Sequence, residues 1–346
     1  MISHHFAEGL RNVPGVQLLA VGSRSSVKAE EFARQFSVLR AYGSFEELVR
    51  DKDVDVIYIA TPSQFHKEHC LLCLEAGKAV LCEKPFTHDA GQAEEVISLA
   101  RKKELFCMEA MWMRFLPIMG KLQKLLADNT IGDVRMVMAD LGFASSCGLK
   151  GTQDYDRGKG ALLDLGVYPL SLVFFLLGKP VQVLSQVSIN AVGVDEQLAA
   201  IMRYPGGELG IISASKLASL SGEGLIVGTR GQIRIHAPLY RPHKLTISLS
   251  PNLGDSSKPP SSWLMRIRRN SILRAMYFRF EDIFGLVLGK RDQKIVVEPF
   301  EGNGYNYEIG EVVRCLREGH CESQVMSLDE TLNIMKTLDV IRHQWR

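Results

Sequence analysis

The stretch that decides the fold runs from Val54 to Pro85 and reads VDVIYIATPSQFHKEHCLLCLEAGKAVLCEKP. Its first apolar run, residues 54–60, predicts a buried strand that ends at Thr61-Pro62. Helical periodicity follows over residues 66–76, and a second apolar strand is expected at 79–82. A strand, a helix and a strand in this order predict a βαβ unit with parallel strands.

The same alternation extends outward on both sides of this stretch. The further expected elements are strands at 16–21 and 105–109 and helices at 6–12, 27–36, 44–50 and 90–103. Strands that alternate with helices are typical of a Rossmann-type parallel sheet, so the fold class is α/β. We assign this part, residues 1–115, to a dinucleotide-binding domain.

The remaining residues, 116–346, show a different pattern. We expect helices at 117–127, 160–177, 307–317 and 328–343, and strands at 134–143, 181–191, 197–204, 208–215, 225–228 and 233–236. Short glycine-containing connections between strands favour antiparallel pairing. The sequence therefore predicts a C-terminal α+β domain with an open, largely antiparallel sheet, which we expect to bind substrate and form oligomer contacts.

The glycine-rich phosphate loop of a Rossmann domain is missing. No Gly-x-Gly-x-x-Gly occurs in the chain, and the first predicted helix begins only a few residues after Met1. We therefore expect the first strand and most of the loop to lie upstream of Met1, or dinucleotide binding to be abnormal. Without that strand the parallel sheet would lose its centre.

Composition excludes several classes of function. A net charge of +2 with 23% charged residues gives no strong field for binding nucleic acid. No apolar run is long enough to span a bilayer and no signal peptide is evident, so we expect a cytoplasmic protein with reduced cysteines. The arginine-rich segment 263–288, which follows a linker at 251–262, is expected to pack on its own domain, with membrane or partner contact as the alternative.

The residues after the second strand bear on the choice of cofactor. The strand at 16–21 leads into Gly22-Ser23-Arg24, where NAD enzymes carry an acidic residue for the ribose hydroxyls. A hydroxyl and a cation suit a 2′-phosphate instead. The sequence therefore favours NADP over NAD, with Ser23 and Arg24 as binding residues.

Two motifs stand at neighbouring strand ends, where ligands of open α/β sheets bind. They are Thr61-Pro62-x-x-x-His66 and Glu83-Lys84-Pro85. With them, five blocks in order resemble the glucose-fructose oxidoreductase and inositol dehydrogenase family (Gfo/Idh/MocA), above all its dimeric dihydrodiol dehydrogenases and NADP-dependent D-xylose dehydrogenases. The blocks are Ala41–Ser44, Ala79–Pro85, Met108–Phe115, Gly160–Tyr168, and Gly302–Tyr305 with Glu308.

The resemblance implies roles for several residues. Glu83 and Lys84 would lie beside the nicotinamide, together with Thr61, Pro62 and His66 at the neighbouring strand end. Trp112 and Arg114 would line the nicotinamide and substrate pocket, although packing is an equal alternative for Trp112. The family also implies a homodimer, which exposed sheet faces favour.

The chemistry can also be argued from residue types. Hydride transfer at a CH–OH group needs a proton acceptor and donors for the developing oxyanion, and Lys84 and Tyr168 are of the right kind. Burial would disfavour the charged form of Lys84. Asp164 lies four residues before Tyr168, so we expect a buried carboxylate on the same helix face that, by resemblance, contacts substrate. Satisfying nearby backbone is the alternative for Asp164.

We therefore expect an NADP-dependent dehydrogenase or reductase acting on a polyol, sugar or dihydrodiol. The alternative is an inactive ligand-sensing or regulatory protein that keeps the fold, as the missing glycine loop would allow. A zinc site built from four side chains of one helix, His66, His69, Cys70 and Cys73, is rejected because zinc ligands usually come from loops or paired elements. We expect no metal.

Overall fold

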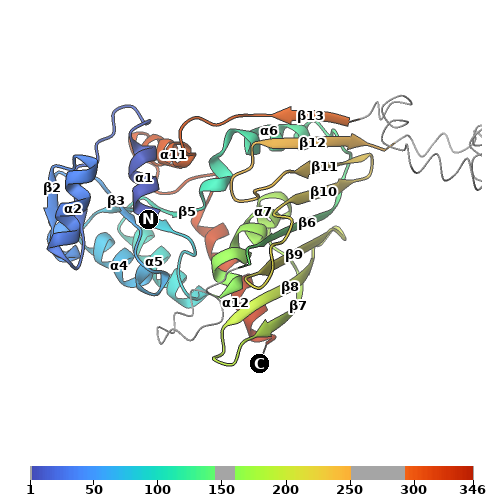
Figure 1. Cartoon of the computed structure of the whole chain (residues 1–346), viewed down its shortest axis with the longest axis horizontal. Helices are drawn as coiled ribbons and strands as arrows, with labels where there is room; N and C mark the ends of the chain where they lie inside the picture. The colour runs from blue at the N-terminus through green and yellow to red at the C-terminus, as the bar shows by residue number, and fades with distance from the viewer. Residues whose placement is uncertain (1, 145–159, 251–292, 346) are drawn as a thin grey trace, which may run out of the picture.

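The structure is a computed structural model that describes residues 2–144, 160–250 and 293–345 (Figure 1). Its N-terminal half is built from short parallel strands and helices, and its C-terminal half is dominated by one large sheet. The linker at 251–262 and the arginine-rich segment 263–288 lie outside the described residues. None of the helices in the described ranges is long and apolar enough to cross a bilayer.

The N-terminal half alternates helices and strands as predicted. Its elements are α1 (Ile2–Leu10), β1 (Ala20–Gly22), α2 (Ser26–Phe36), β2 (Arg40–Tyr42), α3 (Phe45–Val49), β3 (Val56–Ile59), α4 (His66–Glu75), β4 (Ala79–Glu83), α5 (Ala90–Lys102) and β5 (Cys107–Ala110). Side-chain caps set several helix starts: the hydroxyl of Ser44 accepts from the Glu47 backbone N–H, and the carboxylate of Asp89 accepts from that of Gln92.

The parallel strands form two separate sheets, one of β1 and β2 and one of β3, β4 and β5. In the described residues no strand joins β1 to β3, where the first strand of a Rossmann sheet would lie. Beside β3, the ring of Phe6 from α1 stacks on Tyr58, with ring centres 3.6 Å apart. An aromatic contact therefore helps to attach α1 to the three-stranded sheet.

The C-terminal half contains one eight-stranded sheet. Its elements are α6 (Pro117–Ala127), β6 (Val134–Gly142), α7 (Val167–Leu177), β7 (Gln182–Ile189), β8 (Asp195–Arg203), β9 (Leu209–Ser215), β10 (Gly224–Gly228), β11 (Gly231–Ile235), β12 (Lys244–Leu249) and β13 (Gln293–Val297), followed by α11 (Tyr305–Arg317) and α12 (Leu328–His343). The strand order is β13-β12-β11-β10-β6-β9-β8-β7. Every pair is antiparallel except β6 with β9, which confirms the predicted largely antiparallel sheet.

One face of this sheet is covered and the other is open. The apolar helix α7 packs on β6 and β9, and α12 packs on β7, so the core lies on the side toward the N-terminal half (Figure 1). The last two helices also reach back, because α11 packs on α1 and α12 on α5. The domain boundary at 115/116 stays a prediction.

Some elements differ from the sequence expectations. Residues 16–19 are not part of a strand, and β2, β12 and β13 were not predicted. Trp112 and Arg114 lie in a 3₁₀ turn, Trp112–Phe115, that follows β5 and was not predicted. The predicted helix at 160–177 begins with a one-turn π-helix, Leu162–Gly166, before α7.

Candidate active site

The carboxyl end of β4 places Glu83 and Lys84 inside the protein. Glu83 is buried, accepts a hydrogen bond from the Tyr58 hydroxyl of β3, and accepts a second from the Lys84 backbone N–H at 3.2 Å. Burial raises the pKa of Glu83, while Tyr58 and Lys84 oppose that rise. Glu83 therefore fixes the backbone from which the Lys84 side chain extends.

Lys84 meets both of its predicted partners. Its Nζ lies 3.2 Å from Asp164 Oδ1 and donates to the Asp164 backbone oxygen at 2.8 Å. The same nitrogen lies over the face of the Tyr168 ring, 4.8 Å from the ring centre. The structure thus brings the three predicted catalytic residues together, although they come from two segments about 80 positions apart.

The charge on Lys84 differs from the sequence expectation. Burial acts to lower the pKa of Lys84, but Tyr168, Asp164 and Glu83 raise it to about 12. The expectation that burial would favour the neutral amine is therefore wrong for the protein alone, because the acidic neighbours outweigh desolvation. Burial raises the pKa of Tyr168 above its usual value, and Lys84 opposes this effect.

Asp164 is less enclosed than its apolar neighbours suggested. Its side chain is 43% exposed, so the expectation of a buried carboxylate is wrong. Asp164 lies in the π-helix Leu162–Gly166, and π-helical turns of this kind are frequent at functional sites. Burial acts to raise the pKa of Asp164, but Lys84 and a second lysine lower it below its usual value.

That second lysine, Lys216, is a site residue that the sequence analysis missed. It follows β9 directly, its backbone N–H donates to the Glu196 oxygen at 2.8 Å, and its Nζ lies 2.9 Å from Asp164 Oδ2. The Asp164 carboxylate therefore lies between two ammonium groups, one on each oxygen. The only local signal in the sequence was a cation directly after a predicted strand.

Aromatic rings adjoin the charged groups. Trp112 stacks on Tyr305 with ring centres 4.7 Å apart, and its indole N–H donates to the Tyr168 hydroxyl at 3.4 Å. This stacking requires a glycine at 304, where a Cβ would come within 3.0 Å of the Trp112 ring and φ is +98°. Tyr240, which was not predicted, lies 6.2 Å from Trp112 and 6.1 Å from Tyr168, measured between ring centres.

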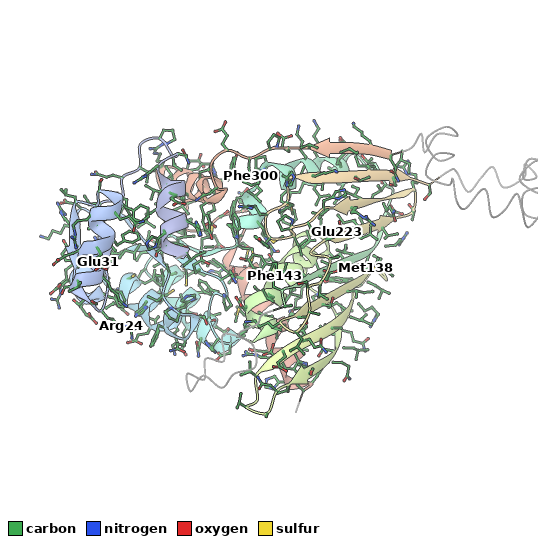
Figure 2. The ribbon with its side chains drawn as sticks, viewed as in Figure 1. Arg24, Glu31, Met138, Phe143, Glu223 and Phe300 are labelled. Carbon is green, nitrogen blue, oxygen red and sulfur yellow. The ribbon has the colours of Figure 1, made fainter. Side chains whose placement is uncertain are left out.

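Phe143 extends the aromatic set and was also not predicted. Its ring lies edge-on to Tyr240 at 6.1 Å and its backbone N–H donates to the Ser215 oxygen, next to Lys216. The residue is 46% exposed and follows β6 at the end of the strand nearer the N-terminal half (Figure 2). An exposed ring beside two lysines and a carboxylate is suited to contact a ligand.

Arg114 does not belong to this site. Its side chain is fully buried, donates to Ser171 at both Oγ and the backbone oxygen, and forms an ion pair with Glu330 of α12 at 2.8 Å. The expectation that Arg114 lines the cofactor pocket is therefore wrong. These contacts instead join the turn after β5 to α7 and α12.

His66 connects the two strand-end motifs. It is buried, with Nε2 2.8 Å from the Thr61 oxygen and Nδ1 2.9 Å from the Pro85 oxygen. Burial lowers its pKa. His66 therefore holds the end of β3 against the end of β4 and is not positioned to touch a ligand directly.

A cavity of about 360 Å³ lies at the carboxyl ends of β1 and β3. Among the described residues, its lining includes the predicted Arg24, Thr61 and Pro62, and also Phe65 and His69, which were not predicted for this role. The guanidinium of Arg24 lies over the Phe65 ring at 5.4 Å. Ser23 does not line the cavity, and its Oγ accepts from the Ser25 N–H.

These features fit two parts of a dinucleotide. The cavity offers the Arg24 cation, an aromatic ring and hydroxyl groups for an adenosine with a 2′-phosphate, and its lining also includes the side chains of Glu46 and Glu68. Lys84, Tyr168 and Trp112 at the next strand ends suit the nicotinamide part. The phosphate loop that would link the two parts is not among the described elements.

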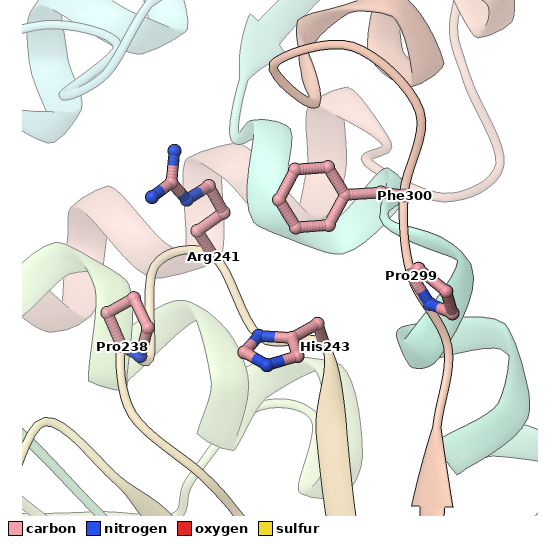
Figure 3. A pocket seen from close by; sticks show the side chains of 5 residues that line it. All are labelled: Pro238, Arg241, His243, Pro299 and Phe300. Carbon is pink, nitrogen blue, oxygen red and sulfur yellow. The ribbon is translucent and has the colours of Figure 1, made fainter.

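A second cavity, of about 320 Å³, lies between the loop from β11 to β12 and the segment that precedes α11 (Figure 3). Its described lining residues are Pro238, Arg241, His243, Pro299 and Phe300. None of them was predicted as a site residue. Its loop also carries Tyr240 of the aromatic set.

Two family models match the chain. Residues 1–111 match an oxidoreductase family with an NAD-binding Rossmann fold, and residues 119–234 match the Gfo/Idh/MocA C-terminal domain. The chain belongs to the Gfo/Idh/MocA oxidoreductase family. The resemblance carried by the five sequence blocks is thereby confirmed.

Relatives of this Gfo/Idh/MocA protein include trans-1,2-dihydrobenzene-1,2-diol dehydrogenases. It is 35% identical to that of Mus musculus over an alignment of 346 positions that covers 99% of this chain and 93% of the relative. It is 39% identical to that of Sus scrofa over 251 residues, which are 71% of this chain and 75% of the relative.

Solved structures of lower identity share the fold. A 3-ketoreductase from Actinomadura kijaniata, in complex with NADP and TDP-benzene, aligns with a TM-score of 0.78 at 20% identity over 99% of this chain and 94% of its own. An aldose-aldose oxidoreductase from Caulobacter crescentus aligns with a TM-score of 0.76 at 20% identity over 99% of this chain and 92% of its own. These alignments confirm the predicted two-part α/β architecture.

Proposed function

We propose that this protein is an NADP-dependent dehydrogenase or reductase that interconverts a CH–OH group and a carbonyl, with a cyclic dihydrodiol as the favoured substrate and sugars or polyols as the other candidates. The observation that carries the proposal is the convergence of Lys84, Asp164 and Tyr168 at the end of β4. Membership of the Gfo/Idh/MocA family and the dihydrodiol dehydrogenase relatives support it.

NADP is proposed over NAD because of the groups around the first cavity. Arg24 is the cation that a 2′-phosphate would need, and Phe65 beneath it offers a ring face. The end of β1 carries no Asp or Glu for the ribose hydroxyls of NAD, because Gly22 ends the strand and Ser23 and Arg24 follow it. A bound nicotinamide would supply the hydride donor or acceptor.

The protein's own residues would manage the proton. The acidic neighbours raise the pKa of Lys84, so its ammonium form is present at neutral pH and has an N–H to direct at the oxygen of a carbonyl during reduction. Tyr168 borders the same position with its ring and, through its hydroxyl, receives the Trp112 N–H. Asp164 holds the ammonium in place and, as a 43% exposed carboxylate, is available to a substrate hydroxyl.

The aromatic rings favour a substrate with an apolar ring. The ring centres of Trp112, Tyr168 and Phe143 each lie 6.1 to 6.2 Å from that of Tyr240, and the Trp112 indole N–H also donates to the Tyr168 hydroxyl. Such rings bind flat apolar surfaces well. A cyclic dihydrodiol combines a flat unsaturated ring with hydroxyl groups. Its ring could contact the aromatic side chains, and its hydroxyl groups could contact the charged ones.

The test begins with NADPH binding, measured by fluorescence, and continues with pentoses, polyols and dihydrodiols as substrates. We expect NADPH to bind and the dihydrodiol to give the highest kcat/KM. NADPH binding without turnover of any of these compounds would favour the ligand-sensing alternative. The division of the parallel strands into two sheets is the observation behind that alternative.

We also propose a homodimer formed through the open face of the large sheet. Cross-strand pairing places Leu184, Ile201, Ile211, Met138 and Leu225 in one row on five neighbouring strands. Leu184 and Ile201 are 59% and 48% exposed, and Figure 2 labels Met138 in this sheet. An apolar row of this length favours contact with a second copy. Light scattering of wild type and of the Ile201→Glu variant tests this.

A further inference from the structure

Side-chain contacts in series connect the first helix to Lys84. The ring of Phe6 on α1 stacks on Tyr58 of β3, and the Tyr58 hydroxyl donates to Glu83 Oε1. The other oxygen of the same carboxyl, Oε2, accepts from the Lys84 backbone N–H at 3.2 Å. Glu83 therefore links Tyr58 to the residue that carries the reacting amine.

The ring and the hydroxyl of Tyr58 have separate partners. The ring is held by stacking, with its centre 3.6 Å from that of Phe6, and a phenylalanine would form the same contact. The hydroxyl contacts Glu83, a buried carboxyl whose charged form needs hydrogen-bond donors inside the protein. Packing alone therefore does not explain the hydroxyl.

The charge of Glu83 depends on the Tyr58 hydroxyl. Burial is the largest effect and raises the pKa of Glu83, whereas the hydrogen bond from Tyr58 and the charge and backbone N–H of Lys84 lower it. Without the Tyr58 donor, Glu83 should take up a proton at a higher pH. The other titratable groups that face Glu83 are Glu109 of β5, Tyr168 of α7, and Tyr305 and Glu308 of α11. None of these four carries a positive charge.

The charged form of Glu83 matters for the position of Lys84. A carboxylate accepts the Lys84 N–H in a charge-assisted hydrogen bond, which is roughly twice as strong as the bond to a neutral acceptor. The next two backbone positions are held separately, by His66 and by Glu109. Because the Lys84 side chain extends from this backbone to Asp164, a displacement of the backbone also displaces Nζ.

We propose that Tyr58 is a positioning residue for Lys84: its hydroxyl keeps Glu83 in the carboxylate form, and that carboxylate holds the Lys84 backbone. The inference rests on the proposed function, because it concerns how the same site keeps its proton donor in place. Tyr58 acts through Glu83 and is not itself catalytic. Loss of its hydroxyl should therefore lower activity only below the pH at which Glu83 takes up its proton.

The first experiment follows the Lys84 backbone amide by NMR in protein labelled with ¹⁵N-lysine, with the signal assigned by its absence in Lys84→Met. In Tyr58→Phe the titration midpoint of Glu83, reported by this amide, should lie about one to two pH units above that of wild type, because a hydrogen bond to a charged group is lost. Glu83→Gln should show no such titration. Tyr42→Phe is the matched control, because the Tyr42 hydroxyl donates at 2.9 Å to a different carboxylate, that of Asp51.

The second experiment measures kcat/KM for the reduction of 2-hydroxycyclohexanone by NADPH across the same titration. Tyr58→Phe should lie within about 2-fold of wild type above its Glu83 midpoint and lose about 10- to 100-fold below it. Glu83→Gln, which cannot ionise, should be low at every pH, and adding Tyr58→Phe to it should lower activity no further. Glu109, whose pKa burial raises to about 7, titrates in wild type and in the Tyr42→Phe control as well, so the comparison isolates Tyr58.

The other outcomes overturn the proposal. An unchanged midpoint in Tyr58→Phe would show that its hydroxyl does not control Glu83, and a loss of activity that is equal at every pH would show a merely structural role. A double variant less active than Glu83→Gln would show that Tyr58 acts by another route. If Tyr58→Phe does not fold, Glu83→Gln decides, because wild-type activity in that variant contradicts the proposal and low activity at every pH supports it.

Failure of the proposed function is distinguishable from failure of this inference. Absence of turnover by wild type contradicts the proposed function, and the amide titration then decides by itself. A raised midpoint in Tyr58→Phe with an unchanged one in Tyr42→Phe supports the link from Tyr58 to Lys84, and equal midpoints in wild type and Tyr58→Phe overturn it.

Discussion

Lys84 contacts Tyr168 through the face of the ring, with its Nζ 4.8 Å from the ring centre. The phenol oxygen is engaged elsewhere, as the acceptor of the Trp112 N–H. The two predicted proton-transfer groups are therefore neighbours, with the ammonium over the ring face and the phenol oxygen directed to the indole.

Carbonyl reduction should keep its proton donor far into the alkaline range. The raised pKa of Lys84, about 12, means that its charged form persists below that pH and is lost only as the pH rises through it. We expect kcat/KM for NADPH-dependent reduction to be flat from about pH 6 to 10. Alcohol oxidation should rise with pH over the same range, and a tenfold fall of the reduction rate per pH unit above pH 8 would contradict the assignment.

Removal of the Arg24 guanidinium should change cofactor preference. Arg24→Ala should raise the Kd for NADPH by about 10- to 100-fold, because a charge-assisted contact to the 2′-phosphate is lost, and should leave the Kd for NADH nearly unchanged. Fluorescence titration with both cofactors measures this. Arg34→Ala on α2, also exposed, is the control, and equal effects on both cofactors would show that Arg24 does not bind the 2′-phosphate.

Arg114 should matter for stability and not for cofactor binding. Arg114→Lys keeps the charge beside Glu330 but cannot reproduce the two hydrogen bonds to Ser171, so we expect a loss of roughly 2–4 kcal/mol in the free energy of unfolding. Urea denaturation measures the loss, with the exposed Arg135→Lys as control. A selective rise in the Kd for NADPH without destabilisation would contradict this prediction and would show that Arg114 contributes to cofactor binding.

Glu109 should make stability depend on pH. It is fully buried, its Oε1 accepts from the Phe86 N–H, and burial raises its pKa from 4.5 to about 7. The folded protein therefore keeps a proton that the unfolded chain releases, so this contribution is full below pH 4.5 and is lost as the pH rises through 7. The loss is roughly 3 kcal/mol at most.

Glu109→Gln should remove that pH dependence while it keeps an acceptor for Phe86. Urea unfolding at pH 5 and pH 8 compares wild type with this variant and with the exposed Glu94→Gln. Only the Glu109 variant should show a smaller difference between the two pH values. An unchanged difference would show that Glu109 ionises normally in the folded state.

The sequence predicted most of the fold because its signals were local. The apolar run that became β4, the helix α6 and the Ser44 cap of α3 all depend on residues within a few positions of one another. β12 was missed although Leu245, Ile247 and Leu249 alternate and its partner β11 is the preceding strand; only its other partner, β13, is distant in sequence.

The candidate site was predictable only in part, for the same reason. Lys84, Asp164 and Tyr168 lie in recognisable blocks, but Tyr168 and Asp164, which act with Glu83 to raise the pKa of Lys84, come from a segment about 80 positions away. Lys216 is 52 positions from Asp164 and has no motif of its own. The burial of Arg114 by Ser171 and Glu330 could not be inferred from a turn that looked like part of a binding block.

The most direct test of the account follows the hydride. Wild type and Lys84→Met are each incubated with NADPH deuterated at C4 and with 2-hydroxycyclohexanone, and deuterium at the carbinol carbon of the product is measured by mass spectrometry. We predict label in the wild-type product and a loss of at least about 100-fold in the variant, with NADPH still bound. Equal labelling by both proteins would contradict a catalytic role for Lys84, and absence of label with wild type would contradict the proposed NADPH-dependent reduction.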